Sequence, residues 1–260
     1  MNRHAFVICA YGESKYLEEC IKSVVNQTEK TPIYIASSTP SKYIDELAKQ
    51  YGIEVFYREG KSDIKDDWNF ACSVADAEWV TVAHQDDVYY SQFAEELHKS
   101  IKNCEDAVMA FTDYHCLIEG QEVDNINCKI RRMQRRTMKS RKLASKKWWK
   151  KRIFALGNSI CCPTVTYHKA VIEGDIFTSE LKFNIDWDTF VKYADYDAPF
   201  IYIDKPLLDY RIHPDATTVK CMDNSLRIKE DTIMFNKFWP EWATKIIMTF
   251  YKLAYKEYKK

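Results

Sequence analysis

Two adjacent carboxylates, Asp86 and Asp87, are the residues of this sequence that most clearly suggest chemistry. They follow a run of apolar and β-branched residues, 79–83, that is typical of a buried strand. Neighbouring carboxylates repel each other unless water or a divalent cation screens them, and their hard oxygens suit manganese or magnesium ions. Ligands of open α/β sheets bind at the carboxyl ends of the strands. The pattern predicts a metal site that could neutralise a diphosphate; the alternative is a solvated turn.

The residues on either side of this strand read as alternating strands and helices. Strands are expected at 4–10, 33–37, 53–57, 78–83, 107–112, 200–203 and 207–212, a hairpin at 113–124, and helices at 14–26, 41–51, 66–75, 91–101, 187–194 and from 223 onward, with a break near 240. Ser14 and Ser41 are expected N-caps, and Gly52 is expected to end the second helix. Such alternation implies βαβ units with right-handed crossovers. The predicted fold class is α/β, with a Rossmann-like, mostly parallel sheet between two layers of helices.

The composition excludes several classes of protein. Among 260 residues, 46% are hydrophobic and 29% charged, which is enough for a globular core. Lys and Arg number 38 and so do Asp and Glu, so the net charge does not indicate a nucleic-acid partner. No run approaches the ~20 apolar residues of a membrane span, and no secretory signal is visible. The 9 cysteines lack a Cys-x-x-Cys motif, which favours free thiols in a reducing cytoplasm.

Six short stretches carry a further pattern in their order and spacing. They are 6–13 (FVICAYGE), 16–28 (YLEECIKSVVNQT), 67–69 (DWN), 84–87 (HQDD), 184–188 (NIDWD) and 210–218 (YRIHPDATT). In these stretches the chain resembles the family 2 glycosyltransferases, and the resemblance covers roughly residues 4–218. It implies a GT-A fold, a nucleotide-diphosphate sugar as donor, and inversion at the anomeric carbon.

The resemblance also assigns residues to the donor nucleotide. Tyr11 and Glu13 match positions that hold the uridine end, and Trp68 and Asn69 are placed near the nucleotide-sugar. Each has a structural alternative: Tyr11 and Glu13 could belong to a polar turn, and Trp68 to the core.

One stretch departs from the family. After the second strand the family carries an Asp-Asp-Gly-Ser type sequence, whose acid contacts the base, whereas this chain reads Ile-Ala-Ser-Ser-Thr at 35–39. Ser37 could hydrogen-bond a base but carries no charge. Uridine is still the expected base, without its usual carboxylate partner.

By the same resemblance, Asp86 and Asp87 match the acidic metal motif. Asp87 is expected to bind Mn²⁺ or Mg²⁺ directly, and Asp86 to contact the ribose or to support the metal ligand. His213 matches a position that can approach the metal or the diphosphate, although a lone histidine is often structural. Arg211 could neutralise a phosphate or brace its own loop.

Asp186 matches the carboxylate that serves as general base in the family. An acceptor hydroxyl is a poor nucleophile, and a carboxylate within reach can take its proton as the new bond forms. Asp188 competes for this role, but residues two apart on a helix do not share a face. A solvated, acid-rich helix N-terminus is the structural alternative.

The segment 129–152 is the clearest compositional shift, because it contains no acidic residue. Its cations are Lys129, Arg131, Arg132, Arg135, Arg136, Lys139, Arg141, Lys142, Lys146, Lys147, Lys150, Lys151 and Arg152. Four interpretations remain open: a mobile solvated loop, a surface for anionic lipids together with Trp148 and Trp149, a site for the diphosphate of a lipid-linked acceptor, or a nucleic-acid site.

Together these patterns predict a GT-A domain over 1–222 and a helical extension over 223–260. Residues 1–112 would form the nucleotide-sugar half, and 113–222 the acceptor half with the basic segment 129–152. The expected activity is inverting transfer from a UDP-sugar to a hydroxyl of a glycan or lipid-linked acceptor, in cell-surface polysaccharide synthesis at the cytoplasmic face of the membrane. The alternative is a non-catalytic module that binds membrane or polyanion. A nucleotidyltransferase would usually have a basic, glycine-rich first turn, and residues 11–13 are acidic instead.

Overall fold

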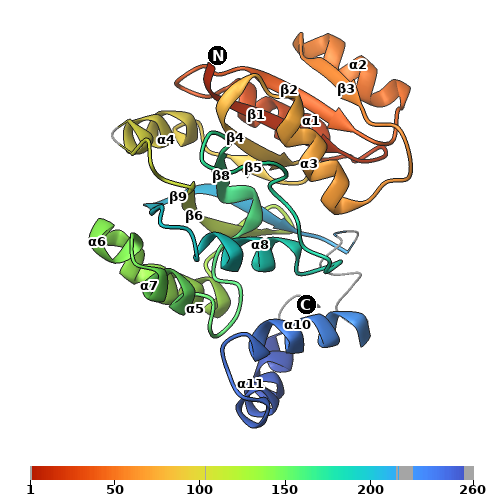
Figure 1. Cartoon of the computed structure of the whole chain (residues 1–260). Helices are drawn as coiled ribbons and strands as arrows, with labels where there is room; N and C mark the ends of the chain where they lie inside the picture. Colours follow the sequence, from red (N-terminus) through yellow and green to blue (C-terminus); the bar gives the residue numbers. More distant parts are fainter. Residues whose placement is uncertain (1, 103, 215, 217–224, 255–260) are drawn as a thin grey trace.

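The computed structural model describes residues 2–102, 104–214, 216 and 225–254 and is built around one curled sheet (Figure 1). Its strands are β1 (Asn2–Ala10), β2 (Ile33–Ser37), β3 (Glu54–Tyr57), β4 (Ala77–His84), β5 (Val88–Tyr89), β6 (Met109–Ile118), β7 (Gln121–Val123), β8 (Val165–His168) and β9 (Phe200–Ile212). They are ordered β3-β2-β1-β4-β8-β6-β9-β5, and β7 pairs with β6.

Helices pack around this sheet. They are α1 (Leu17–Val25), α2 (Lys42–Tyr51), α3 (Ile64–Val74), α4 (Phe93–Ile101), α5 (Ile126–Arg135), α6 (Arg141–Ala144), α7 (Lys147–Arg152), α8 (Ile185–Tyr193), α10 (Ser225–Asn236) and α11 (Glu241–Ala254), with short 3₁₀ turns η1 (Arg136–Lys139) and η2 (Cys162–Thr164). Within the described ranges, none of the helices combines the length and the apolar character needed to cross a membrane.

The strands β3, β2, β1 and β4 form the parallel half of the sheet. In this half Val7 pairs with Tyr34 on one side and Val82 on the other. Beyond β4 the sheet is mixed, because β8 runs antiparallel to both β4 and β6, while β9 runs parallel to β6. The predicted α/β class with helices on both faces is confirmed.

Alternation along β1 explains the two layers of helices. Phe6 and Ile8 are buried in a cluster with apolar residues of α1, α2 and α4, whereas Ala5 and Val7 are buried in a second cluster with α3, α8, α10 and α11. Successive side chains of a strand point to opposite faces, so one strand serves both cores. Full burial of a side chain such as Phe or Ile contributes about 1.5–3 kcal/mol.

Helix ends follow the predicted signals at α2 but not at α1. The Ser41 side chain accepts from the Ile44 N–H, and Gly52 ends α2 with a φ of 66°. Ser14, however, does not cap α1, which begins at Leu17 after Tyr16. The hydroxyl of Ser14 is used elsewhere, as described below.

Two further predictions concern the second half of the chain. The hairpin is confirmed, with β6 and β7 joined through Glu119 and Gly120, both at positive φ. The two strands expected at 200–203 and 207–212 are instead one strand, β9, whose register with β6 shifts near Asp113. This irregularity accommodates Pro206, which has no N–H to donate. Residues 217–218 of the last motif and the start of the tail at 223 lie outside the described residues.

The basic segment folds into α5, α6 and α7 rather than a loop (Figure 1). Six of its thirteen cations form ion pairs with acids from outside the segment: Arg132 with Asp113 and Asp124, Arg135 with Asp113, Lys139 with Asp204, Arg141 with Asp106, Lys147 with Asp197 and Lys151 with Asp195. Lys150 is buried and donates to the carbonyls of Tyr196 and Ala198 at 2.7 and 2.6 Å. These contacts join the three helices to strands β6 and β9 and to the neighbouring loops.

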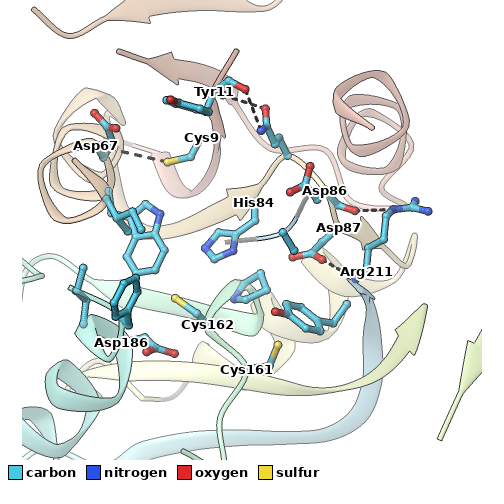
Figure 2. A pocket seen from close by; sticks show the side chains of 18 of the residues that line it. Cys9, Tyr11, Asp67, His84, Asp86, Asp87, Cys161, Cys162, Asp186 and Arg211 are labelled. Atoms are coloured by element: carbon cyan, nitrogen blue, oxygen red, sulfur yellow. Dashed lines mark hydrogen bonds between the residues drawn. The ribbon is translucent and has the colours of Figure 1, made fainter. Parts of the chain in front are cut away.

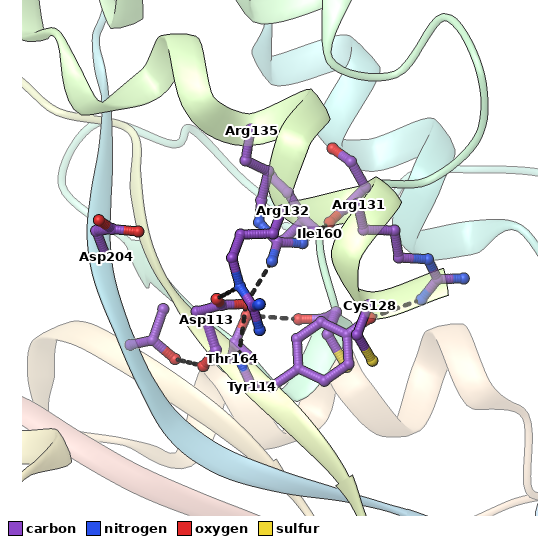
Figure 3. Close-up of polar contacts among 12 residues, drawn as sticks. Asp113, Tyr114, Cys128, Arg131, Arg132, Arg135, Ile160, Thr164 and Asp204 are labelled. Atoms are coloured by element: carbon purple, nitrogen blue, oxygen red, sulfur yellow. Dashed lines mark hydrogen bonds and ion pairs between the residues drawn. The ribbon is translucent and has the colours of Figure 1, made fainter. Parts of the chain in front are cut away.

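Arg135 and Asp113 form the buried centre of this arrangement (Figure 3). Arg135 is 0% exposed and donates to Asp113 Oδ1 at 2.5 Å and to the carbonyl of Ser159. Arg132 donates to the other oxygen of the same carboxylate. A buried ion pair is strongly destabilising to break, because the remaining charge is left without a partner.

We therefore predict that Arg135→Ala lowers the free energy of unfolding by about 3–5 kcal/mol. Urea titration followed by circular dichroism measures this change. Arg136→Ala is the matched control, because Arg136 is the next residue and is exposed; its effect should stay within about 0.5 kcal/mol. Equal effects of the two substitutions would contradict a structural role for the buried pair.

Candidate active site

A cleft of 1080 Å³ opens at the carboxyl ends of β1 and β4 (Figure 2). Eight of the residues expected at a site line it: Tyr11, Glu13, Trp68, Asp86, Asp87, Asp186, Arg211 and His213. Stretches separated by up to about two hundred positions in the sequence thus meet in one cavity. This is the edge of the sheet where open α/β folds bind ligands.

Asp87 is the buried member of the acidic pair. Its residue is 2% exposed, and its Oδ1 accepts the backbone N–H of Arg211 at 2.9 Å. Burial raises the pKa of Asp87 well above its usual range; the Arg211 N–H lowers it in part, and the charge of Asp86 raises it. Asp87 therefore joins the end of β4 to β9 from inside the protein.

Asp86 is the member that faces the cleft. Its side chain is 28% exposed, and its Oδ2 lies 3.3 Å from Nε2 of His213. Its Oδ1 accepts the hydroxyl of Ser14 at 2.9 Å, so the serine expected to cap α1 holds this carboxylate instead.

Arg211 braces both acids rather than projecting freely into the cleft. Its Nε donates to the carbonyl of Asp86 at 2.8 Å, and its terminal nitrogen donates to Glu19 at 2.5 Å. The guanidinium also lies over the ring of Tyr16, 4.4 Å from its centroid. Of the two roles predicted for Arg211, bracing the loop is the one that these contacts support.

The two ring nitrogens of His213 are potential metal ligands. Both ring nitrogens are buried and lack a hydrogen-bond partner, and the ring packs edge-on against Tyr16 at 4.8 Å. An imidazole nitrogen facing a carboxylate oxygen is a suitable pair of ligands for a divalent cation such as Mn²⁺. The residues present therefore fit a metal between Asp86 and His213.

Asp186 stands on the other side of the same cleft (Figure 2). It lies in the first turn of α8, and its Oδ2 accepts the side-chain amide of Asn158 at 2.7 Å. Burial raises the pKa of Asp186, and the N–H of Trp187 lowers it in part. Asp188 points elsewhere, toward the hydroxyl of Ser179 at 2.6 Å and toward Lys237, and it does not line the cleft.

The start of α8 is held by Glu230 of α10, a contact that the sequence did not indicate. The buried carboxylate accepts three successive backbone N–H groups, at 182, 183 and 184, over 2.8, 2.8 and 3.1 Å. These are the donors just before the helix that carries Asp186. The C-terminal helices thus take part in positioning this acid.

Trp68 and His84 form a stacked pair in the cleft wall, with ring centroids 5.1 Å apart. Burial lowers the pKa of His84 to about 4, although the charge of Asp86 raises it in part, so the imidazole is neutral at physiological pH. Trp68 lines the cleft and also packs against the core.

Two expected nucleotide contacts are used inside the protein instead. The amide of Asn69 makes two hydrogen bonds to the backbone of Phe177, at 2.8 and 2.9 Å. The hydroxyl of Ser37 accepts the N–H of Thr39 at 3.0 Å within a turn. Neither residue lines the cleft, so the described contacts do not support these two assignments, which remain predictions.

Asp67 supplies a carboxylate near the end of β2, where the family acid is missing. Its Oδ2 accepts the hydroxyls of Ser38 at 3.0 Å and Ser62 at 2.7 Å, and its Oδ1 accepts two donors of Arg58. It lines the cleft. Its place in the Asp-Trp-Asn motif was visible in the sequence, but the contact with the β2 end was not.

Tyr11 is the exposed aromatic residue at the rim, with 60% of its surface accessible. Its backbone N–H and carbonyl pair with the side-chain amide of Gln85 at 2.9 and 3.1 Å. These two bonds join the loops that follow β1 and β4.

The sequence matches a known protein family. The model of the family described as "Glycosyl transferase family 2" matches residues 5–164. The chain belongs to glycosyl transferase family 2. A comparison with curated proteins gives no significant match.

Solved glycosyltransferases share the fold. They include Staphylococcus aureus TarS 1-349 (16% identity, TM-score 0.60, covering 95% of this chain and 69% of that one) and the mannosyltransferase PcManGT of Pyrobaculum calidifontis in complex with GDP-Man and Mn²⁺ (13%, 0.61, 95% and 69%). A third is glucosyl-3-phosphoglycerate synthase of Mycobacterium tuberculosis in complex with Mn²⁺, UDP and phosphoglyceric acid (12%, 0.57, 90% and 78%). The chain covers 42% of the longer TarS structure. At these identities the likeness establishes the GT-A fold of this glycosyltransferase.

We predict that Asp186 titrates above the ordinary aspartate value of about 3.9. Asn158→Ala should move the midpoint higher still, because a donor to the carboxylate favours its charged form. Carboxyl ¹³C NMR titration, with Asp186→Asn to assign the signal, measures both midpoints. Asp188→Asn should leave the Asp186 midpoint in place; an unchanged or lower midpoint in Asn158→Ala would contradict the proposed contact.

Proposed function

We propose that this family member is an inverting, metal-dependent glycosyltransferase. The observation that carries the proposal is the placement of Asp86 and His213 on one side of a single cleft and Asp186 on the other. A donor diphosphate and an acceptor hydroxyl need these two kinds of group, and they need them within one cavity.

For the metal, we propose Asp86 and His213 as the ligands. Asp87, the ligand expected from the sequence, is buried and bonded to the backbone of Arg211, so we assign it to supporting the loop. A divalent ion bound at this position supplies positive charge that stabilises a departing diphosphate. Mn²⁺ is favoured over Mg²⁺ because the pair includes an imidazole nitrogen.

For the chemistry, we propose that Asp186 accepts the proton of the acceptor hydroxyl as it attacks the anomeric carbon. Its raised pKa makes the carboxylate a better proton acceptor than a solvated aspartate. Attack from the face opposite the leaving group inverts the anomeric centre. Asn158 and Glu230 orient the acid, the first directly and the second through the start of α8.

For the donor, we propose a nucleotide-diphosphate sugar with uridine as the base. Tyr11 offers an exposed ring for the base, and Glu13 lies beside it on the rim. Ser38 and Asp67 stand where the family acid is missing and are the candidates for contacts with the base. Complexes of similar proteins with UDP-GlcNAc and with GDP-Man leave both bases to be compared in the test.

For the acceptor, we propose a glycan or lipid-linked hydroxyl in surface polysaccharide synthesis, at the cytoplasmic face of the membrane. Support comes from α11, where Trp242, Ile246 and Phe250 are 69%, 53% and 68% exposed at a spacing of four. Lys245 and Lys252 are exposed on the same helix. An apolar stripe with neighbouring lysines fits the interface of an anionic bilayer.

The alternative, a non-catalytic module that binds polyanions through the basic segment, has less support. Most cations of that segment with assigned partners face protein carboxylates or carbonyls. A binding module also has no need for an acid such as Asp186 opposite the metal pair.

The donor proposal predicts a metal-dependent thermal shift. A nucleoside diphosphate at ~100 times its Kd should stabilise the protein by about 2.7 kcal/mol, with UDP exceeding GDP and Mn²⁺ increasing the effect. Asp86→Asn and His213→Gln should lose the part that depends on Mn²⁺. Asp66→Asn, an exposed acid of α3, is the control. Absence of any shift with either nucleotide would reject the transferase.

A variant of Asp186 distinguishes nucleotide binding from catalytic turnover. Asp186→Asn should keep the nucleotide shift but lower donor turnover by about 10²–10⁴-fold, measured as release of nucleotide from the sugar donor that gives the largest shift. Asp188→Asn should turn over normally. Full turnover by Asp186→Asn would exclude it as the base.

The membrane proposal predicts co-sedimentation with vesicles of phosphatidylglycerol and phosphatidylcholine. Replacing Trp242 and Phe250 by Ser should weaken binding about tenfold or more, because each buried apolar side chain contributes about 1.5–3 kcal/mol. Met133→Ser, at a position that is also 69% exposed, is the control. Equal binding by all three proteins would exclude this face.

A further inference from the structure

A second group of potential metal ligands lies outside the cleft. His115 on β6, Glu122 on β7 and Asp209 on β9 each offer one ligand atom, and these atoms lie within 4.8 Å of one another. None of the three lines the cleft. We refer to these three residues as the His115 cluster.

The sheet register brings the His115 cluster together. Asp209 is the direct partner of His115 across the β6–β9 ladder. Glu122 pairs with Leu117, which is two residues from His115 and therefore on the same face of β6. Three strands thus deliver one nitrogen and two oxygen donors to one side of the sheet, without any loop in between.

The His115 cluster is exposed to solvent on the side of Glu122 and buried on the side of Asp209. His115 Nδ1 lies 3.5 Å from Glu122 Oε2, and the side chains are 24% and 57% exposed. Asp209 is 7% exposed at the base of the group. An ion could therefore enter past Glu122 and reach the buried carboxylate.

Tyr90 orients the buried ligand. Its hydroxyl lies 3.0 Å from Asp209 Oδ1, to which it donates, and 3.1 Å from His115 Nδ1. Residues that hydrogen-bond to metal ligands in this way fix their orientation and raise affinity. Burial raises the pKa of Asp209, the Tyr90 hydroxyl lowers it in part, and the charge of Glu122 raises it.

The charges of the cluster favour a divalent cation. Two carboxylates close to each other carry a charge of about −2 when ionised, and a divalent cation would cancel it. A mixed set of one imidazole and two carboxylates suits Zn²⁺ or Mn²⁺ better than Mg²⁺ or Ca²⁺, which prefer oxygen alone. Three protein ligands leave at least one position for water.

We propose that His115, Glu122 and Asp209 form a second site for a divalent transition ion, distinct from the site proposed at Asp86 and His213. The ion would tie β7 and β6 to β9, two residues before Arg211 on the same strand. It would thus stiffen the strand whose Arg211 braces Asp86 and Asp87. The proposal does not depend on the transferase activity.

The test uses the full chain carrying Asp86→Asn and His213→Gln, so that the first site cannot contribute. Titration calorimetry with Zn²⁺, without nucleotide, should detect one ion per chain at this site. Adding Glu122→Gln, at an exposed position, should weaken affinity by at least about 10–100-fold, because loss of even an outer partner typically costs that much. His115→Gln should do the same. Replacing Zn²⁺ by Co²⁺ should give visible absorption bands that both variants lose.

His98→Gln is the matched control. His98 also contacts a carboxylate, Glu29, at 2.7 Å, but it belongs to no such three-ligand group in the described chain. This variant should keep the full affinity. Absence of Zn²⁺ binding in the starting protein would overturn the proposal and leave the cluster as a hydrogen-bond network. Equal affinity in Glu122→Gln and the control would overturn it as well, and far-ultraviolet circular dichroism excludes misfolding as the cause of any loss.

Discussion

The arrangement of the cleft depends on how the buried carboxylate of Asp87 is satisfied. A buried charge is costly unless it is hydrogen-bonded, and the partner of Asp87 is the backbone of Arg211, 124 positions away. The same arginine holds the carbonyl of Asp86 and packs over Tyr16. One set of contacts thus joins the end of β4, the start of α1 and the end of β9. These contacts hold in place the segments that carry Asp86 and His213, the residues proposed to bind the metal.

Charge compensation also explains the basic segment. A run of thirteen cations without an acid reads as a free surface when only its own residues are considered. Its acids include Asp113 of β6, Asp124 of the loop before α5 and Asp204 of β9. The composition of the segment therefore predicted its positive charge. It could not predict the ion pairs, because the acidic partners come from distant positions in the sequence.

Local patterns were sufficient for most of the elements. The β2 strand, the Ser41 cap and the Gly52 ending follow from neighbours a few residues away, and the structure has them as expected. The line of motifs likewise identified eight residues that meet in the cleft. The motifs could not predict which residue each side chain contacts. Ser14 donates to Asp86 rather than capping a helix, and the side chain of Asn69 hydrogen-bonds to the backbone of Phe177.

The contact between Glu230 and the start of α8 has a mechanical meaning. Three hydrogen bonds from consecutive N–H groups to one buried carboxylate leave little freedom between α10 and the turn before Asp186. A displacement of α10 would carry Asp186 with it, while the strands that hold Asp86 stay in place. A partner that moved α10 would therefore change the distance between Asp186 and Asp86, even though α10 lies outside residues 5–164 that the family model matches.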